Sequence, residues 1–276
     1  MYFEWTYTQF VSGDSFLNII FHNTSMFAFD SEPYISFCLY NRANASYKYE
    51  RVKPTKQEWD YLFSMLQSDS GEKYLDFSIG SLSIQGTLNK GRCCRKVNVN
   101  LHDGGNSNYS KWIVLIPHGL FSGRLAIDNT VLHINAFVYQ DQQFGTMPVQ
   151  TFLDKWSWGV VASSDGTRCC FSVLDQDGKA KTIKWTCSET SMDIFIEKVF
   201  YDDFYRALLS ETKHTCLPQI WNPPIKIWVN KEIPLRKRIK EDYDSFQFTY
   251  YRYICSEEGK ILGVSELMQI ERDERI

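Results

Sequence analysis

The sequence predicts a mostly β protein of antiparallel strands, arranged in barrels or sandwiches, and three observations support this fold class. Between residues 74 and 101, short alternating segments separated by Gly80, Gly86 and Gly91 are typical of an antiparallel meander. Aromatic residues make up 16% of the 276-residue chain, which suits a sheet-rich protein around an apolar space. In the first half of the chain only one stretch has clear helical spacing.

The strands of the first half are predicted from alternation or from short apolar runs. They are expected over residues 1–7, 16–21, 33–40, 112–116, 121–125 and 131–138. Pro117-His118-Gly119 is expected to turn the chain between two of these strands, because Gly and Pro interrupt regular structure. For the same reason, the segment from Phe144 to Pro148 is expected to end the strand that precedes it.

The helix is predicted to begin at Thr55-Lys56-Gln57-Glu58, an S/T-x-x-E capping box that follows Pro54. It is expected to end near Ser68-Asp69-Ser70-Gly71. Its apolar residues keep helical spacing: Trp59, Leu62, Phe63 and Leu66. An isolated amphipathic helix among strands is expected to act as a lid or plug on a sheet; a partner-binding helix is the alternative.

The second half is expected to continue as strands. These are predicted over residues 156–158, 169–174, 181–187, 225–229, 246–253 and 261–267. Asp175-Gln176-Asp177-Gly178 predicts a hairpin turn, and Phe200–Leu209 predicts a short helix.

An internal repeat relates the two halves. Trp5 and Trp156, Tyr7 and Trp158, and Asp14 and Asp165 are each separated by 151 positions. Both places combine an aromatic-x-aromatic strand, a Gly/Asp turn and an apolar strand. We therefore predict two related β domains, residues 1–150 and 151–276, with chance similarity as the alternative.

The charge and the terminus exclude several classes of partner. A net charge of −3 favours neither nucleic acid nor an anionic membrane, and acidic residues follow the basic stretch 231–240 directly. No run approaches the ~18 apolar residues that a membrane-spanning helix needs, so stable membrane insertion is not expected. The N-terminus carries Glu4 and has no basic start, which predicts no signal peptide and a cytoplasmic location.

Cofactor and metal motifs are absent from the sequence. There is no G-x-G-x-x-G, no Walker loop and no G-x-S-x-G, and the five histidines are dispersed. The eight cysteines form no C-x-x-C and are predicted to be free buried thiols. We therefore expect no cofactor and no metal, although a Cys–His nucleophile pair stays open.

The stretch from Tyr139 to Gly159 carries the densest group of chemically useful residues. It combines the acid Asp141 and the phenol Tyr139 with two amides, Gln142 and Gln143, and two indoles, Trp156 and Trp158. A carboxyl in an apolar pocket has a raised pKa and can act as an acid, and indole faces stabilise a developing cation. A turn role for Asp141 and core packing for the aromatic residues are the simpler alternatives.

Three patches of the sequence resemble the hydroxyneurosporene synthase (carotenoid hydratase) and AttH-like family, to which the fungal decalin-forming Diels–Alderases are distantly related. The first is Glu4-Trp5-x-Tyr7 followed by Phe21-His22, the second is Tyr139-x-Asp141-Gln142-Gln143-x-Gly145 before Trp156-x-Trp158, and the third is Gly263-Val264-Ser265-Glu266. The resemblance implies two lipocalin-like β domains, packed together with a few short helices, with a ligand site between them. Where the family's hydratases have His and Asn, this chain has Gln142 and Gln143, and Phe144 replaces a frequent Trp.

Glutamine does not shuttle protons at neutral pH, so the resemblance favours the cyclase branch over a hydratase. The expected function is a cofactor-independent cyclase or pericyclase-type isomerase acting on a lipophilic polyene, terpenoid or polyketide-derived intermediate. The alternatives are a hydratase of an isoprenoid double bond and a non-catalytic carrier. The candidate catalytic residues are Asp141, Tyr139 and Gln142, and the candidate substrate-binding residues are Glu4, Trp5, Tyr7, Gln143, Phe144, Trp156, Trp158, Tyr251 and Glu266.

Overall fold

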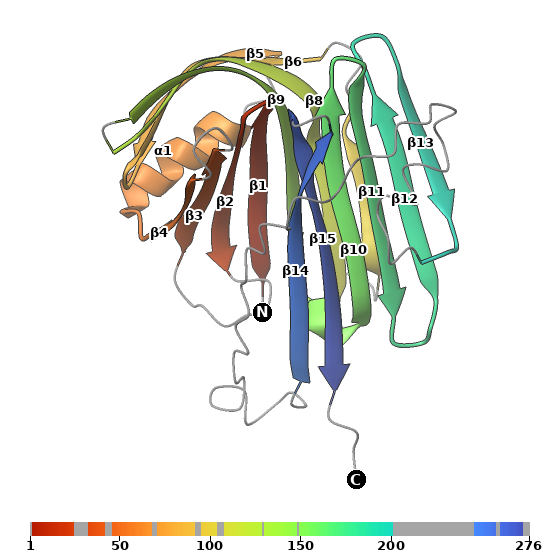
Figure 1. The fold of residues 1–276 in the computed structure, drawn as a ribbon. Coiled ribbons are helices and arrows are strands. Elements are labelled where there is room, and N and C mark those ends of the chain that lie inside the picture. Colours follow the sequence, from red (N-terminus) through yellow and green to blue (C-terminus); the bar gives the residue numbers. More distant parts are fainter. Residues whose placement is uncertain are drawn as a thin grey trace. The chain divides into compact units, whose positions relative to one another are not determined.

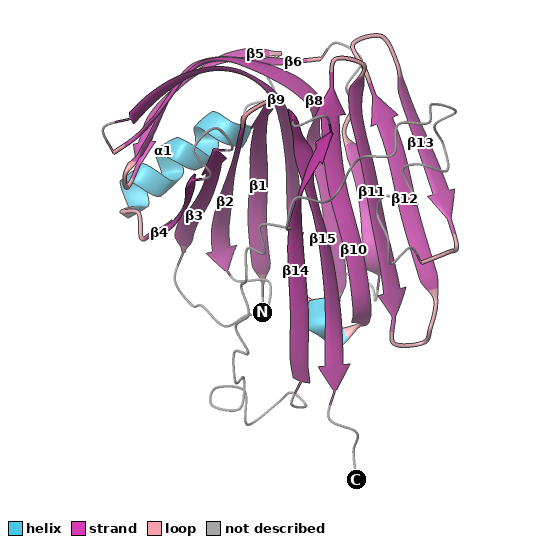
Figure 2. Cartoon of the chain, in the orientation of Figure 1, coloured by secondary structure: helices cyan, strands magenta, loops and turns pink. Residues whose placement is uncertain are grey.

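The chain is described here by a computed structural model. The described residues are 2–24, 33–41, 46–67, 71–91, 95–103, 108–128, 130–147, 149–200, 246–257 and 260–272. They are mostly strand, with one α-helix and one short 3₁₀ helix, so the predicted fold class is confirmed (Figure 2). Of the helix predicted over 200–209 only Phe200 is described, and the strand predicted at 225–229 and the basic stretch 231–240 lie outside the described residues.

The chain forms two compact units. The first unit comprises Met1–Pro148, Ala162–Thr167 and Cys187–Met192, and the second comprises Val149–Val161, Arg168–Thr186 and Asp193–Ile276. The division into two related β domains at residues 1–150 and 151–276 stays a prediction. Within the part of the chain that is described, no helix is long and apolar enough to cross a membrane.

The first unit contains a nine-stranded antiparallel sheet. Its strands are β1 (Phe3–Ser12), β2 (Ser15–Thr24), β3 (Tyr34–Asn41), β4 (Ser46–Val52), β5 (Glu72–Ile79), β6 (Leu82–Lys90), β7 (Val97–Asp103), β8 (Tyr109–Ile127) and β9 (Thr130–Gly145). The order is β4-β3-β2-β1-β9-β8-β6-β5, and β7 pairs with the first part of β8. Figure 1 shows this sheet curling around the single helix.

Helix α1 (Lys56–Gln67) fills the inside of the curled sheet, as the plug interpretation predicted. The capping box is present, because the backbone N–H of Glu58 donates to Thr55 Oγ1 at 3.2 Å and the N–H of Thr55 donates to Glu58 Oε2 at 2.7 Å. Leu62 and Leu66 are buried in one core with apolar residues of β1, β2, β3, β5, β6, β8 and β9. The helix is therefore held by hydrophobic burial as well as by its cap.

Strand β8 departs from the sequence prediction. A turn was expected at Pro117-His118-Gly119, but the strand runs without interruption from Tyr109 to Ile127. Its pairing with β9 shifts register between Val114 and Ile116 and again between Ile116 and Gly119. These irregularities accommodate the proline, which has no N–H to donate to the ladder, so the turn prediction was wrong.

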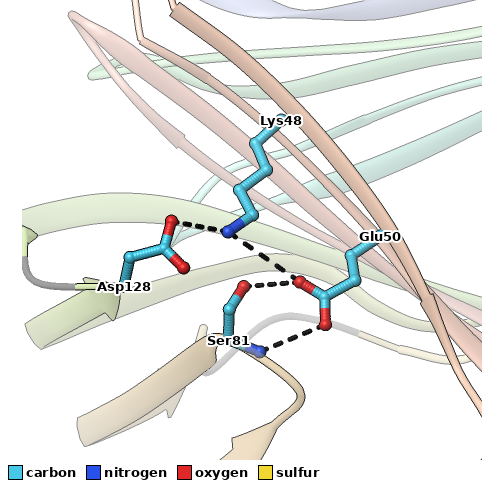
Figure 3. A network of polar contacts seen from close by, with 4 residues as sticks. All are labelled: Lys48, Glu50, Ser81 and Asp128. Carbon is cyan, nitrogen blue, oxygen red and sulfur yellow. Dashed lines mark hydrogen bonds and ion pairs between the residues drawn. The ribbon is translucent and has the colours of Figure 1, made fainter.

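A polar clasp of four residues joins strand β4 to two turns of the first unit (Figure 3). Glu50 of β4 accepts hydrogen bonds from Ser81, at 2.5 Å from Oγ and 3.2 Å from the backbone N–H. Lys48, also of β4, lies 2.6 Å from a carboxylate oxygen of Asp128 and 3.9 Å from Glu50. Because β4 and β5 are the two ends of the strand order, the clasp ties one edge of the sheet to the turn beside the other.

The second unit contains a six-stranded sheet of order β13-β12-β11-β10-β15-β14, preceded by η1 (Val149–Thr151). Its strands are β10 (Leu153–Ser163), β11 (Gly166–Asp175), β12 (Ala180–Cys187), β13 (Met192–Glu197), β14 (Phe246–Glu257) and β15 (Lys260–Arg272). The predicted hairpin turn is present, with the N–H of Gly178 donating to the carbonyl of Asp175 at 3.0 Å. Four cysteines whose side chains are described are buried thiols outside any disulfide, as predicted: Cys38, Cys169, Cys170 and Cys187.

The two sheets share one feature of their strand order, while the internal repeat itself stays a prediction. Strand β1 is the first strand of its sheet along the chain, and it lies between the second strand, β2, and the last, β9. In the second sheet, the first strand, β10, likewise lies between the second strand, β11, and the last, β15. Tyr7 pairs with Asp141 in the first sheet, and its repeat partner Trp158 pairs with Glu266 in the second. Each half therefore places an aromatic residue of its opening strand opposite a carboxylate of its closing strand.

Candidate functional site

Strand alternation gives the β1–β9 pair two faces with different residues. One face, termed the helix face, carries Phe10 opposite Val138, and both belong to the core that contains α1. The opposite face, termed the polar face, carries Tyr7 opposite Asp141 and Gln9 opposite Tyr139. The pairing of β1 with β9 shows no register shift from Phe3 to Val11, so each side chain can be assigned to a face.

Two buried hydrogen bonds occupy the centre of the polar face. The Tyr139 hydroxyl donates to Asp141 Oδ2 at 2.6 Å, and the Tyr7 hydroxyl donates to Gln9 Oε1 at 3.0 Å. The rings of Tyr7 and Tyr139 lie 6.3 Å apart and are tilted by 56°. All four side chains are buried, with Asp141 only 4% exposed. The sequence-predicted pair Tyr139 and Asp141 is thus in direct contact, away from solvent.

A row of aromatic side chains crosses the polar face beside this centre. Trp5 of β1 is opposite Gln143 of β9 and His22 of β2, and Gln143 is opposite Trp112 of β8. His22 is in turn opposite Tyr34 of β3. Gln143 and Trp112 are almost fully buried, whereas Trp5 is partly exposed. The row provides flat apolar surface on both sides of one amide group.

His22 stays neutral on this face at physiological pH. Burial, together with the positive charge of Arg51, lowers the pKa of His22 to about 3. The His22 and Tyr34 rings stack at 4.1 Å, and the Arg51 guanidinium carbon lies 3.6 Å over the Tyr34 ring. One ring nitrogen of His22 lies 3.3 Å from the hydroxyl of Ser36. The imidazole therefore offers one donor and one acceptor and carries no charge.

Three of the predicted site residues lie on the helix face instead. Glu4 is opposite Phe144, and Gln142 is opposite Thr6, in the same alternation as Phe10 and Val138. Gln142 Nε2 donates to Glu4 Oε1 across the two strands. The structure therefore brings Glu4, Gln142 and Phe144 together, but it separates them by the sheet from Tyr139 and Asp141.

The remaining predicted residues belong to the second unit. Trp156 and Trp158 lie on one face of β10 and are buried, as the W-x-W alternation predicted. Glu266 of β15 is opposite Trp158 and is partly buried. Tyr251 lies in β14, where its backbone is opposite Leu267. The placement of these residues in one cavity with Asp141 stays a proposal.

Sequence reasoning missed several residues of the polar face: Gln9, Asn18, Trp112 and His22 as a member of the site. Gln9, Asn18 and His22 reach Asp141 only through the pairing of β1 with β9, which are distant in sequence, and Trp112 reaches it through the pairing of β8 with β9. Only Gln9 carried a local indication, since it lies two positions after Tyr7 and so shares its face. Among the residues that the structure describes, no group of His, Cys, Asp or Glu could hold a metal ion.

No protein-family model matches this sequence, and no curated protein matches it. The solved structure of CghA with Sch210972 is similar in fold, with a TM-score of 0.53 at 8% identity over 100% of this chain and 89% of that one. A putative AttH from Nitrosomonas europaea has a TM-score of 0.49 at 11% identity over 98% of this chain and 92% of its own. Kievitone hydratase from Nectria haematococca has a TM-score of 0.42 at 9% identity, over 98% and 89%. The likeness to CghA shows a shared lipocalin-like fold.

Proposed function

We propose that this protein is a cofactor-independent cyclase or pericyclase-type isomerase of a lipophilic polyene, terpenoid or polyketide-derived intermediate. The polar face supplies its reacting groups, and the aromatic row folds the substrate. The observation that carries the proposal is the buried Tyr139–Asp141 hydrogen bond of 2.6 Å beside the rings of Tyr7 and Trp5. The sequence resemblance to the decalin-forming Diels–Alderases and the fold shared with CghA, solved in complex with Sch210972, support the same class.

The Tyr139–Asp141 pair can move a proton without a cofactor. Asp141 accepts the hydroxyl proton of Tyr139 in a hydrogen bond, which raises the basicity of the phenol oxygen. As Tyr139 Oη takes a proton from the substrate, its own proton can pass to Asp141 Oδ2, and the reverse transfer delivers a proton to another substrate atom. The substrate then gains and loses one proton, so its composition is unchanged, as an isomerisation requires.

Folding of the substrate on the protein is the second source of the rate acceleration. A flexible polyene held against flat rings loses the freedom that makes ring closure slow in solution, and such positioning is worth up to ~7–11 kcal/mol of barrier. Trp5 and Trp112 provide these rings, together with the neighbouring tyrosines Tyr7 and Tyr139. Gln142 and Glu4, bonded to each other on the helix face, would hold β1 against β9 and keep these rings in position.

The test is the mass of the product formed in labelled water. The purified protein is incubated in H₂¹⁸O with an extract from a deletion strain of the source organism, and consumed and new compounds are compared by mass spectrometry. The proposal predicts a product of the same mass as the consumed compound, without ¹⁸O. A product heavier by one labelled water would identify a hydratase, and binding without conversion would identify a carrier.

A further inference from the structure

Three buried polar atoms of the polar face have no hydrogen-bond partner among the described residues. They are Nε2 of Gln9, Oδ1 of Asn18 and Nε2 of Gln143. Their side chains are 0%, 1% and 3% exposed. A buried polar atom without a partner costs about 1–3 kcal/mol, so three on one face are a substantial cost to stability.

The ladder places these atoms at two positions along the polar face. Asn18 of β2 is directly opposite Gln9 of β1, and Gln9 is opposite Tyr139 of β9. Gln143 lies four residues beyond Tyr139 on the same strand, which corresponds to about 14 Å of extended chain. Tyr139 is therefore at the first position, and Asp141 lies between the two positions.

The hydrogen-bonding character at each position is defined by its neighbours. The Tyr7 hydroxyl donates to Gln9 Oε1, which leaves the Nε2 group of Gln9 as the free donor. Beside it, Asn18 Oδ1 is a free acceptor. This position therefore offers a donor and an acceptor on neighbouring strands, and the Gln143 position offers a donor.

We propose that Gln9, Asn18 and Gln143 recognise oxygen functions at two separated points of an elongated substrate, so the substrate is an oxygenated polyene and not a hydrocarbon. The Gln9–Asn18 position fits a carbonyl with an adjacent hydroxyl or N–H group, and the Gln143 position fits a second carbonyl or hydroxyl oxygen. This inference rests on the proposed function, because it assigns the substrate class for the same site.

A hydrocarbon chain would leave all three polar atoms unpaired in the complex. A carbonyl-bearing chain would satisfy them while its apolar part lies on the aromatic row. Buried polar groups of a binding site discriminate strongly against ligands that offer them no hydrogen-bond partner. The sequence left several substrate classes open. Among them, the polar face favours oxygenated intermediates over carotene-like hydrocarbons.

The test compares two polyenes with the same carbon skeleton, retinamide, which ends in a carboxamide, and axerophtene, which ends in a methyl group. Their affinities are measured by quenching of tryptophan fluorescence. Wild-type protein is expected to bind retinamide about tenfold more tightly than axerophtene, the effect of one or two net hydrogen bonds. The double variant Asn18→Leu/Gln143→Leu is expected to reduce this ratio at least about fivefold.

Thr6→Val is the matched control. Thr6 Oγ1 is also buried without a partner, but it belongs to the helix face of the same strand. All three substitutions remove an unpartnered polar atom, so none of them is expected to lower the melting temperature. Only the double variant should change the ligand ratio.

Equal affinities for the two probes in wild-type protein would overturn the inference and leave ordered water as the partner of these atoms. An unchanged ratio in the double variant, an equal loss in Thr6→Val, or binding of neither probe up to its solubility limit would also overturn it. The assay measures binding alone. A protein that shows the ratio but converts no substrate would therefore refute the proposed function and leave the recognition intact.

Discussion

The polar face contains a histidine whose protonation is set by its surroundings. Because burial and Arg51 lower the pKa of His22 to about 3, the folded protein keeps this ring neutral while the unfolded chain protonates it near pH 6.5. The unfolded state then binds more protons as the pH falls from 6.5 toward 3. Stability linked to His22 is present above pH 6.5 and is lost through this window.

We predict that the unfolding free energy of the wild-type protein falls as the pH is lowered from 6.5 to 4. The contribution of one histidine is at most about 1.4 kcal/mol per pH unit. The His22→Gln variant lacks this contribution, so its unfolding free energy should fall less steeply between pH 6.5 and pH 4. Urea unfolding at several pH values measures both slopes, and parallel slopes would contradict the assignment.

Single residues were only partly predictable from the sequence. Tyr139 and Asp141 were both predicted as catalytic residues, and their contact follows from alternation, since residues i and i+2 share a face. The same rule separates Gln142 from them, although the motif Y-x-D-Q-Q suggested a single group. Gln9, Asn18 and Trp112 could not be predicted, because their presence depends on the pairing of four strands and not on a local pattern.

Two polar contacts stabilise elements of the first unit, one at the start of α1 and one at strand β4. At the start of α1, Thr55 and Glu58 exchange the bonds of the capping box. Thr55→Ala is expected to lower the melting temperature by about 2–4 °C, through loss of a cap worth about 1 kcal/mol. Ligand affinity should not change, because the helix lies on the face opposite to Asp141. A Thr55→Ser variant, which retains the capping oxygen, should melt like the wild type.

The second stabilising contact is the polar clasp around Glu50 of strand β4. Glu50→Ala removes both hydrogen bonds to Ser81 and the interaction with Lys48, and it is expected to cost about 1–3 kcal/mol in urea unfolding. The matched control is Asp177→Ala, which removes an exposed ion pair with Lys179 within one hairpin and should have no measurable effect. Equal effects of the two substitutions would show that the clasp is only a surface ion pair. Gly80, at φ +56°, lies in the turn that the clasp holds, and a Cβ there would clash with Glu50 Oε1.

Helices and strands were predicted well where a local sequence pattern sets their position, and poorly where the pairing of strands sets it. The capping box and its apolar spacing located α1 within about a residue, and most strands were found by alternation. Pro117 was misread because a proline in a sequence indicates a break, whereas a long antiparallel strand can absorb it with a register shift.

At the scale of the whole molecule, each of the two sheets has a carboxylate opposite an aromatic residue, Asp141 opposite Tyr7 and Glu266 opposite Trp158. The sequence offset indicated the related opening strands, β1 and β10. It did not indicate the closing strands β9 and β15, because these follow connections of different length in the two halves. Asp141 accepts a buried hydrogen bond from a tyrosine two residues before it, whereas the residue two positions before Glu266 is Val264; for this reason we propose that the reacting groups belong to the first sheet.

The most direct test of this assignment is the turnover of Asp141→Asn compared with its ligand affinity. Asparagine retains the size and can accept the Tyr139 hydrogen bond, but it does not hold a proton in the relay. We predict a 10²–10⁴-fold loss of kcat, typical of a lost proton-transfer group, with the dissociation constant of the substrate changed less than about threefold. Turnover within about threefold of the wild type would contradict the central role of the Tyr139–Asp141 pair.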